Sequence, residues 1–141
     1  IEGKWVKEEN LHLTWVFLGD QRDEKTVINK LKKISPLEDH TGIKELGYFG
    51  RPPRVFFSKS EEKVLYDKAR EFKNAGFNLY RFKPHMTLCR IKAIHDYKAY
   101  KEKLKLYREK ELGLILPKIQ LYESRLTSKG SEYTSRYTIE L

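Results

Sequence analysis

The chain has 141 residues, which is enough for one ordinary domain with a core of its own. Its 29 Lys and Arg residues against 20 Asp and Glu give a net charge of +9, which attracts polyanions but does not identify a partner. Because no apolar run approaches the roughly 20 residues that span a bilayer, and the start has no signal-peptide pattern, we expect a soluble, cytoplasmic protein with no membrane contact. Nothing in the composition indicates an obligate protein partner.

The first predicted element is a strand over residues 11–18, a segment rich in Leu, Val, Phe, Trp and Thr that ends at a Gly-Asp pair. A helix is expected to follow it, with Asp20 as its cap. Apolar residues recur at helical spacing from Val27 to Ile34, and Pro36 ends the pattern. The chain therefore opens with a strand and a helix.

Two strands and a second helix are predicted next. Residues 43–49 and 54–58 have the composition of strands, and the Gly-Arg-Pro-Pro segment between them cannot continue a ladder. We expect a hairpin or a short crossover there. Residues 60–74 carry an apolar stripe at helical spacing, and Gly76 is placed to end that helix in a left-handed conformation.

The last third of the chain predicts a strand at about residues 85–91 and then a helix that Asp96 opens. Residues 112–126 and 133–141 are expected to be two strands, joined by a turn-rich loop. The order of elements indicates an α+β protein in which adjacent strands are antiparallel.

One short motif occurs twice. The triplet His-x-Thr comprises His12 and Thr14 in the first predicted strand, and His85 and Thr87 in a later one. In a strand, side chains at i and i+2 point to the same face, so each triplet presents an imidazole beside a hydroxyl. Each triplet also precedes a helix after a short break, which indicates a repeated architecture rather than a repeat array.

Each histidine has a structural alternative, because a lone histidine among apolar strand residues is usually a hydrogen-bonded packing residue. The matching threonines favour chemistry for His12 and His85. His40 and His95 have no such partner and are expected on the surface. Cys89 is the only cysteine, and we interpret it as a small buried apolar residue.

A metal site and a serine nucleophile are both disfavoured by the spacings. The chain has no HExxH or CxxC motif, and no carboxylate shares an obvious face with either motif histidine. It also has no Gly-x-Ser-x-Gly segment. We therefore expect a site with no metal and no cofactor.

Two imidazoles and two hydroxyls suit displacement at phosphorus. A neutral imidazole can accept a proton from a nucleophile while a protonated one donates a proton to a leaving oxygen, and histidine does both near neutral pH. The threonine hydroxyls can donate hydrogen bonds to the nonbridging phosphate oxygens.

The segments around these motifs resemble a known family. The resemblance is to the RNA 2′,3′-cyclic phosphodiesterases, or 2′-5′ RNA ligases, which form a branch of the two-histidine (LigT-like) phosphoesterase superfamily. It covers nearly the whole chain and is carried by residues 9–19, 47–50, 53–57, 82–90 and 119–126.

The resemblance implies a bilobal α+β fold in which two antiparallel sheets face a central groove, with helices on the outside. It also implies an enzyme that opens RNA 2′,3′-cyclic phosphates to 2′-phosphates and that can join 2′-5′ linkages. In this family His12 would be the general acid and His85 the general base, with Thr14 and Thr87 holding the phosphate. We expect residues 1–141 to be a single bilobal domain that lacks the strand and helix with which the family usually begins.

Further substrate contacts are expected from Arg90, Tyr48 and Phe49. The family has an arginine after its second motif, but strict alternation would turn Arg90 away from His85 unless a bulge intervenes. Tyr48 and Phe49 could stack on a base, or belong to the core. Two other functions stay open at this point: a phosphoesterase of small cyclic nucleotides, and a noncatalytic RNA-binding or nucleotide-binding module.

Overall fold

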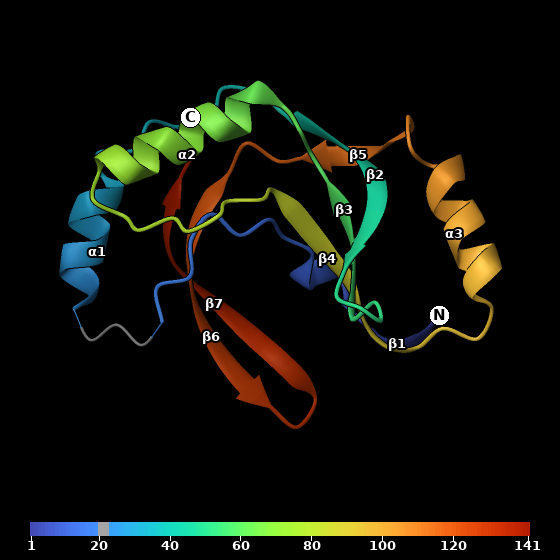
Figure 1. Cartoon of the computed structure of the whole chain (residues 1–141). Coiled ribbons are helices and arrows are strands. Elements are labelled where there is room, and N and C mark those ends of the chain that lie inside the picture. The colour runs from blue at the N-terminus through green and yellow to red at the C-terminus, as the bar shows by residue number, and fades with distance from the viewer. Residues whose placement is uncertain (20–22) are drawn as a thin grey trace.

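The computed structural model describes residues 1–19 and 23–141, and these form two antiparallel sheets and three α-helices (Figure 1). The larger sheet has the strand order β1-β4-β3-β2-β5, with β1 Glu2–Trp5, β2 Thr41–Phe49, β3 Val55–Lys59, β4 His85–Ala93 and β5 Glu111–Ile115. The smaller sheet is a hairpin of β6 Ile119–Thr127 and β7 Gly130–Ile139. The helices are α1 Glu24–Leu31, α2 Lys63–Asn74 and α3 Tyr97–Leu106, and a short 3₁₀ turn covers Glu8–Asn10.

The chain has two separate cores, which confirms the predicted bilobal α+β class. The first core joins α1 and α2 to the base of the β6–β7 hairpin, where Ile119 and Ile139 are buried. The second lies between the larger sheet and α3, and is formed by Phe56, Cys89, Ile91 and Tyr100. Figure 1 shows α3 on the side of the larger sheet that is turned away from α1, α2 and the hairpin. We call this the α3 face of the sheet, and the opposite one the site face.

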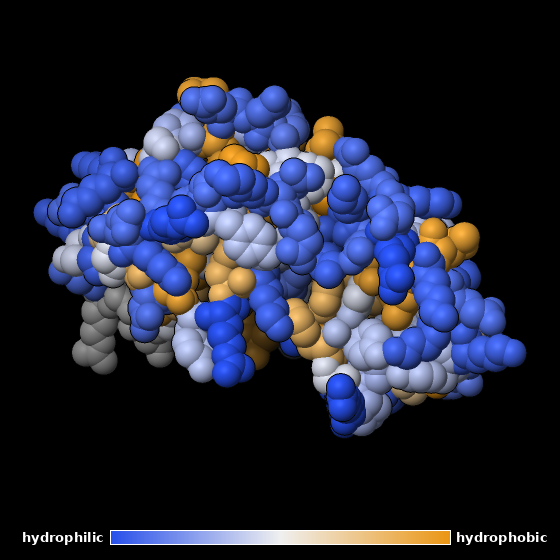
Figure 2. Space-filling view, turned by 45° about the horizontal axis from the view of Figure 1, so that its top comes forward, coloured by the Kyte–Doolittle hydropathy of each residue, from blue (hydrophilic) through white to orange (hydrophobic). Residues whose placement is uncertain are grey.

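The side of the molecule drawn in Figure 2 is predominantly hydrophilic, with apolar residues visible mainly in small patches between charged ones. Among the described residues, no helix has the length and apolar character that crossing a bilayer requires.

Helix boundaries repeat between the two halves of the chain. Asp23 caps α1 by accepting a hydrogen bond from the backbone N–H of Thr26, and Asp96 caps α3 by the same bond from Ala99. Each cap lies eleven positions after the histidine of its motif. The predicted cap Asp20 lies outside the described residues, but the helix begins after Asp23, so the prediction of Asp20 as its cap is wrong. The left-handed Gly76 after α2 is confirmed, with φ of 100°.

Two predicted strands need correction, and one strand was missed. Residues 11–18 do not form a regular strand; their one ladder contact is an isolated antiparallel bridge from Leu13 to Met86. The tail expected as one strand over 112–126 is divided into β5 and β6, because Pro117 cannot donate to a ladder and the chain leaves one sheet for the other there. The short edge strand β1 was not predicted, because its polar sequence has no strand pattern. The hairpin of β2 and β3 is confirmed.

Candidate active site

The two His-x-Thr motifs lie side by side. Their central residues, Leu13 and Met86, are antiparallel bridge partners, although 73 positions separate them along the chain. In an antiparallel pair, the residue before one partner lies opposite the residue after the other. His12 is therefore opposite Thr87, and Thr14 is opposite His85. The bridge thus brings the two motifs together as one candidate site, in which each histidine pairs with the threonine position of the other motif.

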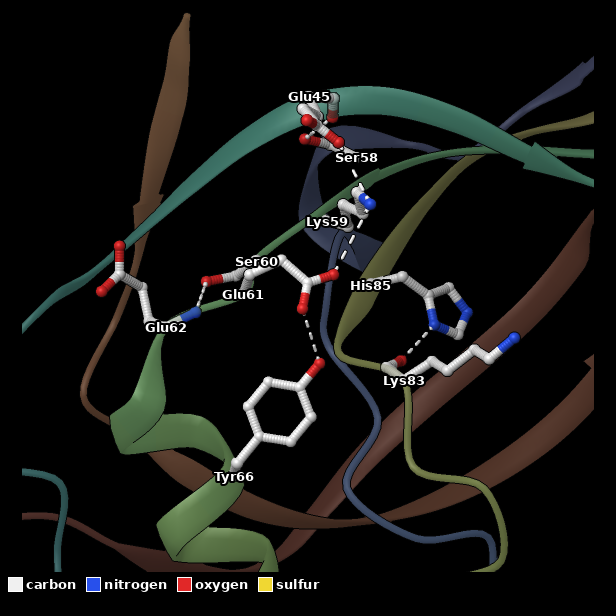
Figure 3. Close-up of polar contacts among 9 residues, drawn as sticks. All are labelled: Glu45, Ser58, Lys59, Ser60, Glu61, Glu62, Tyr66, Lys83 and His85. Carbon is white, nitrogen blue, oxygen red and sulfur yellow. Dashed lines mark hydrogen bonds and ion pairs between the residues drawn. The ribbon is translucent and has the colours of Figure 1, made fainter. Parts of the chain in front are cut away.

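Both imidazoles are held by the same kind of hydrogen bond. The Nδ1 atom of His12 lies 2.6 Å from the carbonyl oxygen of Asn10. Figure 3 shows the matching contact of His85, whose Nδ1 lies 2.6 Å from the carbonyl oxygen of Lys83. A carbonyl oxygen only accepts, so Nδ1 must carry the hydrogen in each ring. In the neutral ring this leaves Nε2 as the unprotonated nitrogen, which can accept a proton and, once charged, donate it.

Aromatic rings fix the position of His85. The ring centroid of Phe49 is 5.1 Å from that of the imidazole, and Phe57 is 5.5 Å from it. Phe57 is buried and lies over Gly47, where a Cβ atom would come within 2.8 Å of the ring. The absence of a side chain at position 47 therefore gives Phe57 the space from which it supports His85.

His12 is supported by the β6–β7 hairpin. The Tyr133 ring meets the imidazole edge-on with centroids 5.3 Å apart, and Tyr122 packs on Tyr133 at 5.5 Å. The side-chain amide of Asn10 donates to the carbonyl of Ser131 at 3.3 Å, which ties the segment before the motif to the same hairpin. Sequence reasoning missed Tyr133, because no local pattern shows that β7 returns to the first motif.

A β-bulge decides the orientation of Arg90. The pairing of β4 with β3 shifts between Phe57 opposite Thr87 and Phe56 opposite Cys89, so Leu88 is the extra residue. Cys89 is in the core beneath α3, which puts it on the α3 face. Arg90, paired with Val55, is on the site face with Thr87, and its side chain is exposed. The bulge thus turns Arg90 toward the face that carries the histidines.

Tyr48 and Phe49 lie on opposite faces of the sheet. Phe49 contacts His85, whereas Tyr48 packs on Tyr100 with centroids 5.8 Å apart and accepts a hydrogen bond from Lys101. Of the two alternatives for these rings, Tyr48 therefore packs against the second core and does not reach the site face, whereas Phe49 lies beside His85. Strand alternation is the reason, because it allows only one of two successive residues to reach the site face.

Lys59, the strand partner of His85, is a cation that is already paired (Figure 3). Its Nζ is 3.1 Å from a carboxylate oxygen of Glu45 and 3.5 Å from one of Glu61. The hydrogen bond to Glu45 is the main cause that raises the pKa of Lys59, against the opposing effect of burial. Glu61 also accepts a hydrogen bond from Tyr66 at 2.9 Å. This network holds the end of β3 beside His85.

Comparison with known proteins identifies the family of this chain. Residues 1–57 match the model of the LigT-like phosphoesterase family. The chain is 37% identical to a protein of Aquifex aeolicus named RNA 2′,3′-cyclic phosphodiesterase, over 95% of this chain and 79% of the relative. The chain belongs to the RNA 2′,3′-cyclic phosphodiesterase family of LigT-like phosphoesterases. The family lies within the two-histidine phosphoesterase superfamily, and its members are enzymes.

Solved structures support the fold of this LigT-like phosphoesterase. The protein TT0787 of Thermus thermophilus superposes with a TM-score of 0.70 at 22% identity, covering 96% of this chain and 80% of that one. E. coli LigT complexed with 3′-AMP superposes with a TM-score of 0.68 at 21% identity, covering 96% of this chain and 79% of that one.

The remaining candidates lie outside the site. His95 is exposed, with its Nε2 2.9 Å from a carboxylate oxygen of Glu2, and His40 is half-exposed beside Asp39, so both are surface residues as predicted. Cys89 is fully buried, as expected, and burial raises the pKa of its thiol. Within residues 1–19 and 23–141, no three His, Cys, Asp or Glu side chains gather as a metal ion would require.

Proposed function

We propose that this phosphoesterase hydrolyses the 2′,3′-cyclic phosphate at the end of an RNA to a 2′-phosphate, using His12 and His85 as its proton-transfer pair and no metal. The observation that carries the proposal is the bridge from Leu13 to Met86, which sets the two motifs antiparallel with each imidazole opposite a threonine. In-line displacement needs a base on the side of the attacking water and an acid on the side of the leaving oxygen. Two imidazoles related by an antiparallel pairing suit these two positions.

The proposed reaction breaks one bond and forms one. Nε2 of His85 accepts a proton from water as the water oxygen bonds to phosphorus, and the bond from phosphorus to the 3′ oxygen breaks. Protonated His12 donates its Nε2 proton to that oxygen, which leaves a 3′-hydroxyl and a 2′-phosphate. The hydroxyls of Thr14 and Thr87 donate hydrogen bonds to the nonbridging oxygens as charge builds on them. Arg90 and Phe49 take up the next phosphate and a base.

The hydrogen bonds to Nδ1 support this assignment of atoms. Each ring has its Nδ1 occupied by a carbonyl at 2.6 Å, so the proton moves at Nε2 in both. Neither step requires a metal, because both the activation of water and the protonation of the leaving oxygen come from imidazole. With a 5′-hydroxyl in place of water, the same steps form a 2′-5′ linkage, so ligation is part of the proposal.

The first test compares histidine variants on an RNA that ends in a 2′,3′-cyclic phosphate, in a buffer containing EDTA. Loss of a general acid or base usually costs about 10²–10⁴-fold in rate, so His12→Ala and His85→Ala should each lose that much kcat. The double variant should lose less than the product of the two, since the pair acts as one unit. His95→Ala is the matched control, because this imidazole is exposed and contacts Glu2 rather than a residue of either motif. Normal turnover by both folded site variants, or wild-type activity that EDTA abolishes, would contradict the proposal.

A second substrate separates the acid from the base. If sulfur replaces the 3′ oxygen of the cyclic phosphate, the leaving thiolate needs no protonation, because thiols are far more acidic than alcohols. His12→Ala should then recover most of its rate on the sulfur substrate, while His85→Ala should not. The opposite pattern would exchange the two roles. The product's phosphate position, read by sensitivity to a 3′-specific phosphatase, tests the proposed 2′-phosphate.

A further inference from the structure

A basic pocket lies on the α3 face of the sheet, which is opposite to the face that carries His85. Its volume is about 250 Å³, and it is formed between β2 and α3, with Tyr48, Lys101, Lys105 and Arg108 in its lining. One carboxylate, that of Glu45, also lines it, but this group is paired with Lys59 at 3.1 Å. The pocket therefore has three cations and one carboxylate, and that carboxylate already pairs with Lys59.

The cations of this pocket have no acidic partners. In the part of the chain that the structure describes, no carboxylate lies within 4.0 Å of the charged groups of Lys101, Lys105 or Arg108. On α2, by contrast, the exposed cations Lys63 and Arg70 both pair with Asp67. Unbalanced cations around one cavity create a positive potential that favours a ligand with phosphate groups.

Tyrosine rings stand beside these cations. The Lys101 ammonium lies 4.4 Å from the ring centre of Tyr48 and 5.4 Å from that of Tyr97, and it donates a hydrogen bond to the Tyr48 hydroxyl. Tyr97 is 49% exposed, so part of its ring is free for another partner. An aromatic face next to cations is the arrangement that binds single-stranded nucleic acid, by stacking a base and pairing its phosphate.

An open edge connects the site face to this pocket. β5 pairs with the first part of β2, from Thr41 to Lys44, and among the described residues no strand pairs with that side of β2 over residues 46–49. At the end of this edge Phe49 contacts His85 on one face, while the adjacent Tyr48 lines the pocket on the other. The exposed Arg51 and Arg54 lie in the turn that follows. This edge is the path along which a single-stranded RNA would run from the site face to the pocket.

We propose that the pocket between β2 and α3 binds a nucleotide of the substrate's single-stranded body, at a point upstream of the reacting cyclic phosphate. The inference rests on the proposed function, because the RNA is taken to reach the pocket from the histidine site. An acidic peptide would match the cations but would leave the exposed face of Tyr97 unused, so RNA fits both features. Each base stacked on an aromatic side chain and each paired phosphate would add affinity for long substrates only.

The test uses charge reversal on α3 with a matched control. Lys105→Glu changes a cation that lines the pocket, and Lys103→Glu makes the same change at an exposed position of the same helix outside it. Binding is measured by fluorescence anisotropy with a labelled single-stranded RNA of about ten nucleotides that ends in a 2′-phosphate. We expect Lys105→Glu to weaken binding by roughly fivefold to tenfold and to lower the salt dependence by about 0.7 in log–log slope. Tyr97→Leu should weaken binding by at least roughly fivefold.

Catalytic rates supply the second readout. Lys105→Glu should raise KM for the cyclic-phosphate form of the same RNA and leave kcat/KM for a mononucleotide 2′,3′-cyclic phosphate unchanged. The proposal that this pocket binds RNA would be overturned by either of two results. One is that Lys103→Glu weakens RNA binding as much as Lys105→Glu does, and the other is that Lys105→Glu and Tyr97→Leu both bind the long RNA as the wild type does. Failure of the proposed function is a different result: the wild-type enzyme would not turn over the mononucleotide, while the anisotropy comparison would still be measurable.

Discussion

Gly47 is the position at which one added methyl group should disturb the site without touching a motif residue. In Gly47→Ala the new Cβ would stand 2.8 and 2.9 Å from two atoms of the Phe57 ring, where ordinary contact begins at 3.4 Å. The ring must therefore move by about 0.6 Å, the difference between 3.4 and 2.8 Å. Phe57 is 7% exposed, and its ring centroid is 4.4 Å from that of Phe49, so the ring cannot turn into solvent.

Two losses should follow from that displacement. Overpacking of a core usually costs about 1–3 kcal/mol, so Tm should fall by roughly 3–10 °C in a domain of this size. His85 rests on Phe57, and a misplacement of about 1 Å can cost 10²-fold in rate, so we expect kcat/KM to fall by about tenfold. The assay is hydrolysis of a 2′,3′-cyclic phosphate together with a thermal melt followed by circular dichroism.

Gly42→Ala is the matched control for this experiment. It makes the same substitution in the same strand, but its Cβ would meet only the Glu111 side chain, at 3.7 Å. Replacing that glycine should leave activity unchanged and should not lower Tm. If Gly47→Ala behaves like Gly42→Ala in both measurements, Phe57 does not depend on the missing side chain. If Tm falls but kcat/KM does not, Phe57 stabilises the sheet without positioning His85.

Other predictions concern titratable groups that are removed from the site. Tyr100 has a buried hydroxyl with no hydrogen-bond partner among the described residues, so Tyr100→Phe should raise the free energy of unfolding by about 1 kcal/mol in chemical denaturation. Burial raises the pKa of Tyr100 to about 12, whereas the unfolded chain loses this proton near pH 10. The free energy of unfolding of the wild type should therefore fall between pH 10 and 12, and that of Tyr100→Phe should fall less. Glu71 has its pKa lowered, since hydrogen bonds from buried Lys68 and from Ser35 outweigh the opposing effect of burial. The stability that ionised Glu71 provides is therefore present above the unfolded pKa of about 4.5 and is lost as pH falls through the folded pKa. Glu71→Gln should lower the free energy of unfolding by about 1–2 kcal/mol at pH 7 and by much less in acid, which urea melts at both pH values would measure. Cys89 should resist a thiol reagent in the native protein and react in denaturant, because it is fully buried.

The sequence predicted most elements whose signal is local. Apolar periodicity identified the three helices, and the Gly-Arg-Pro-Pro segment marked the turn between β2 and β3. The signal for the α1 cap was also present but was misread. The duplicated architecture, with Asp96 eleven positions after His85, indicates Asp23 rather than Asp20 for the corresponding helix.

What the sequence could not predict depends on pairing between distant segments. Residues 11–18 have a strand-like composition, yet this segment lies where the two lobes meet and forms only the bridge to Met86. The same limit applies to Tyr133, which reaches His12 only because β7 folds back across the chain. The bulge at Leu88 is a further case, because alternation from His85 alone would put Arg90 on the wrong face.

The division of the interior into two cores makes the site a property of the whole molecule. The segment after the first motif packs into one core through Trp15 and Val16, whereas the strand of the second motif enters the other through Cys89 and Ile91. The pairing of β1 with β4 and the bridge from Leu13 to Met86 tie the first motif to the larger sheet, while Tyr133 of the hairpin supports His12, so the site depends on both cores. Local opening of either lobe would therefore separate the two histidines while the other lobe keeps its native structure. If the two cores open separately, heat inactivation reports the less stable one, and a substitution that stabilises only the other core would not raise the temperature at which the enzyme loses activity.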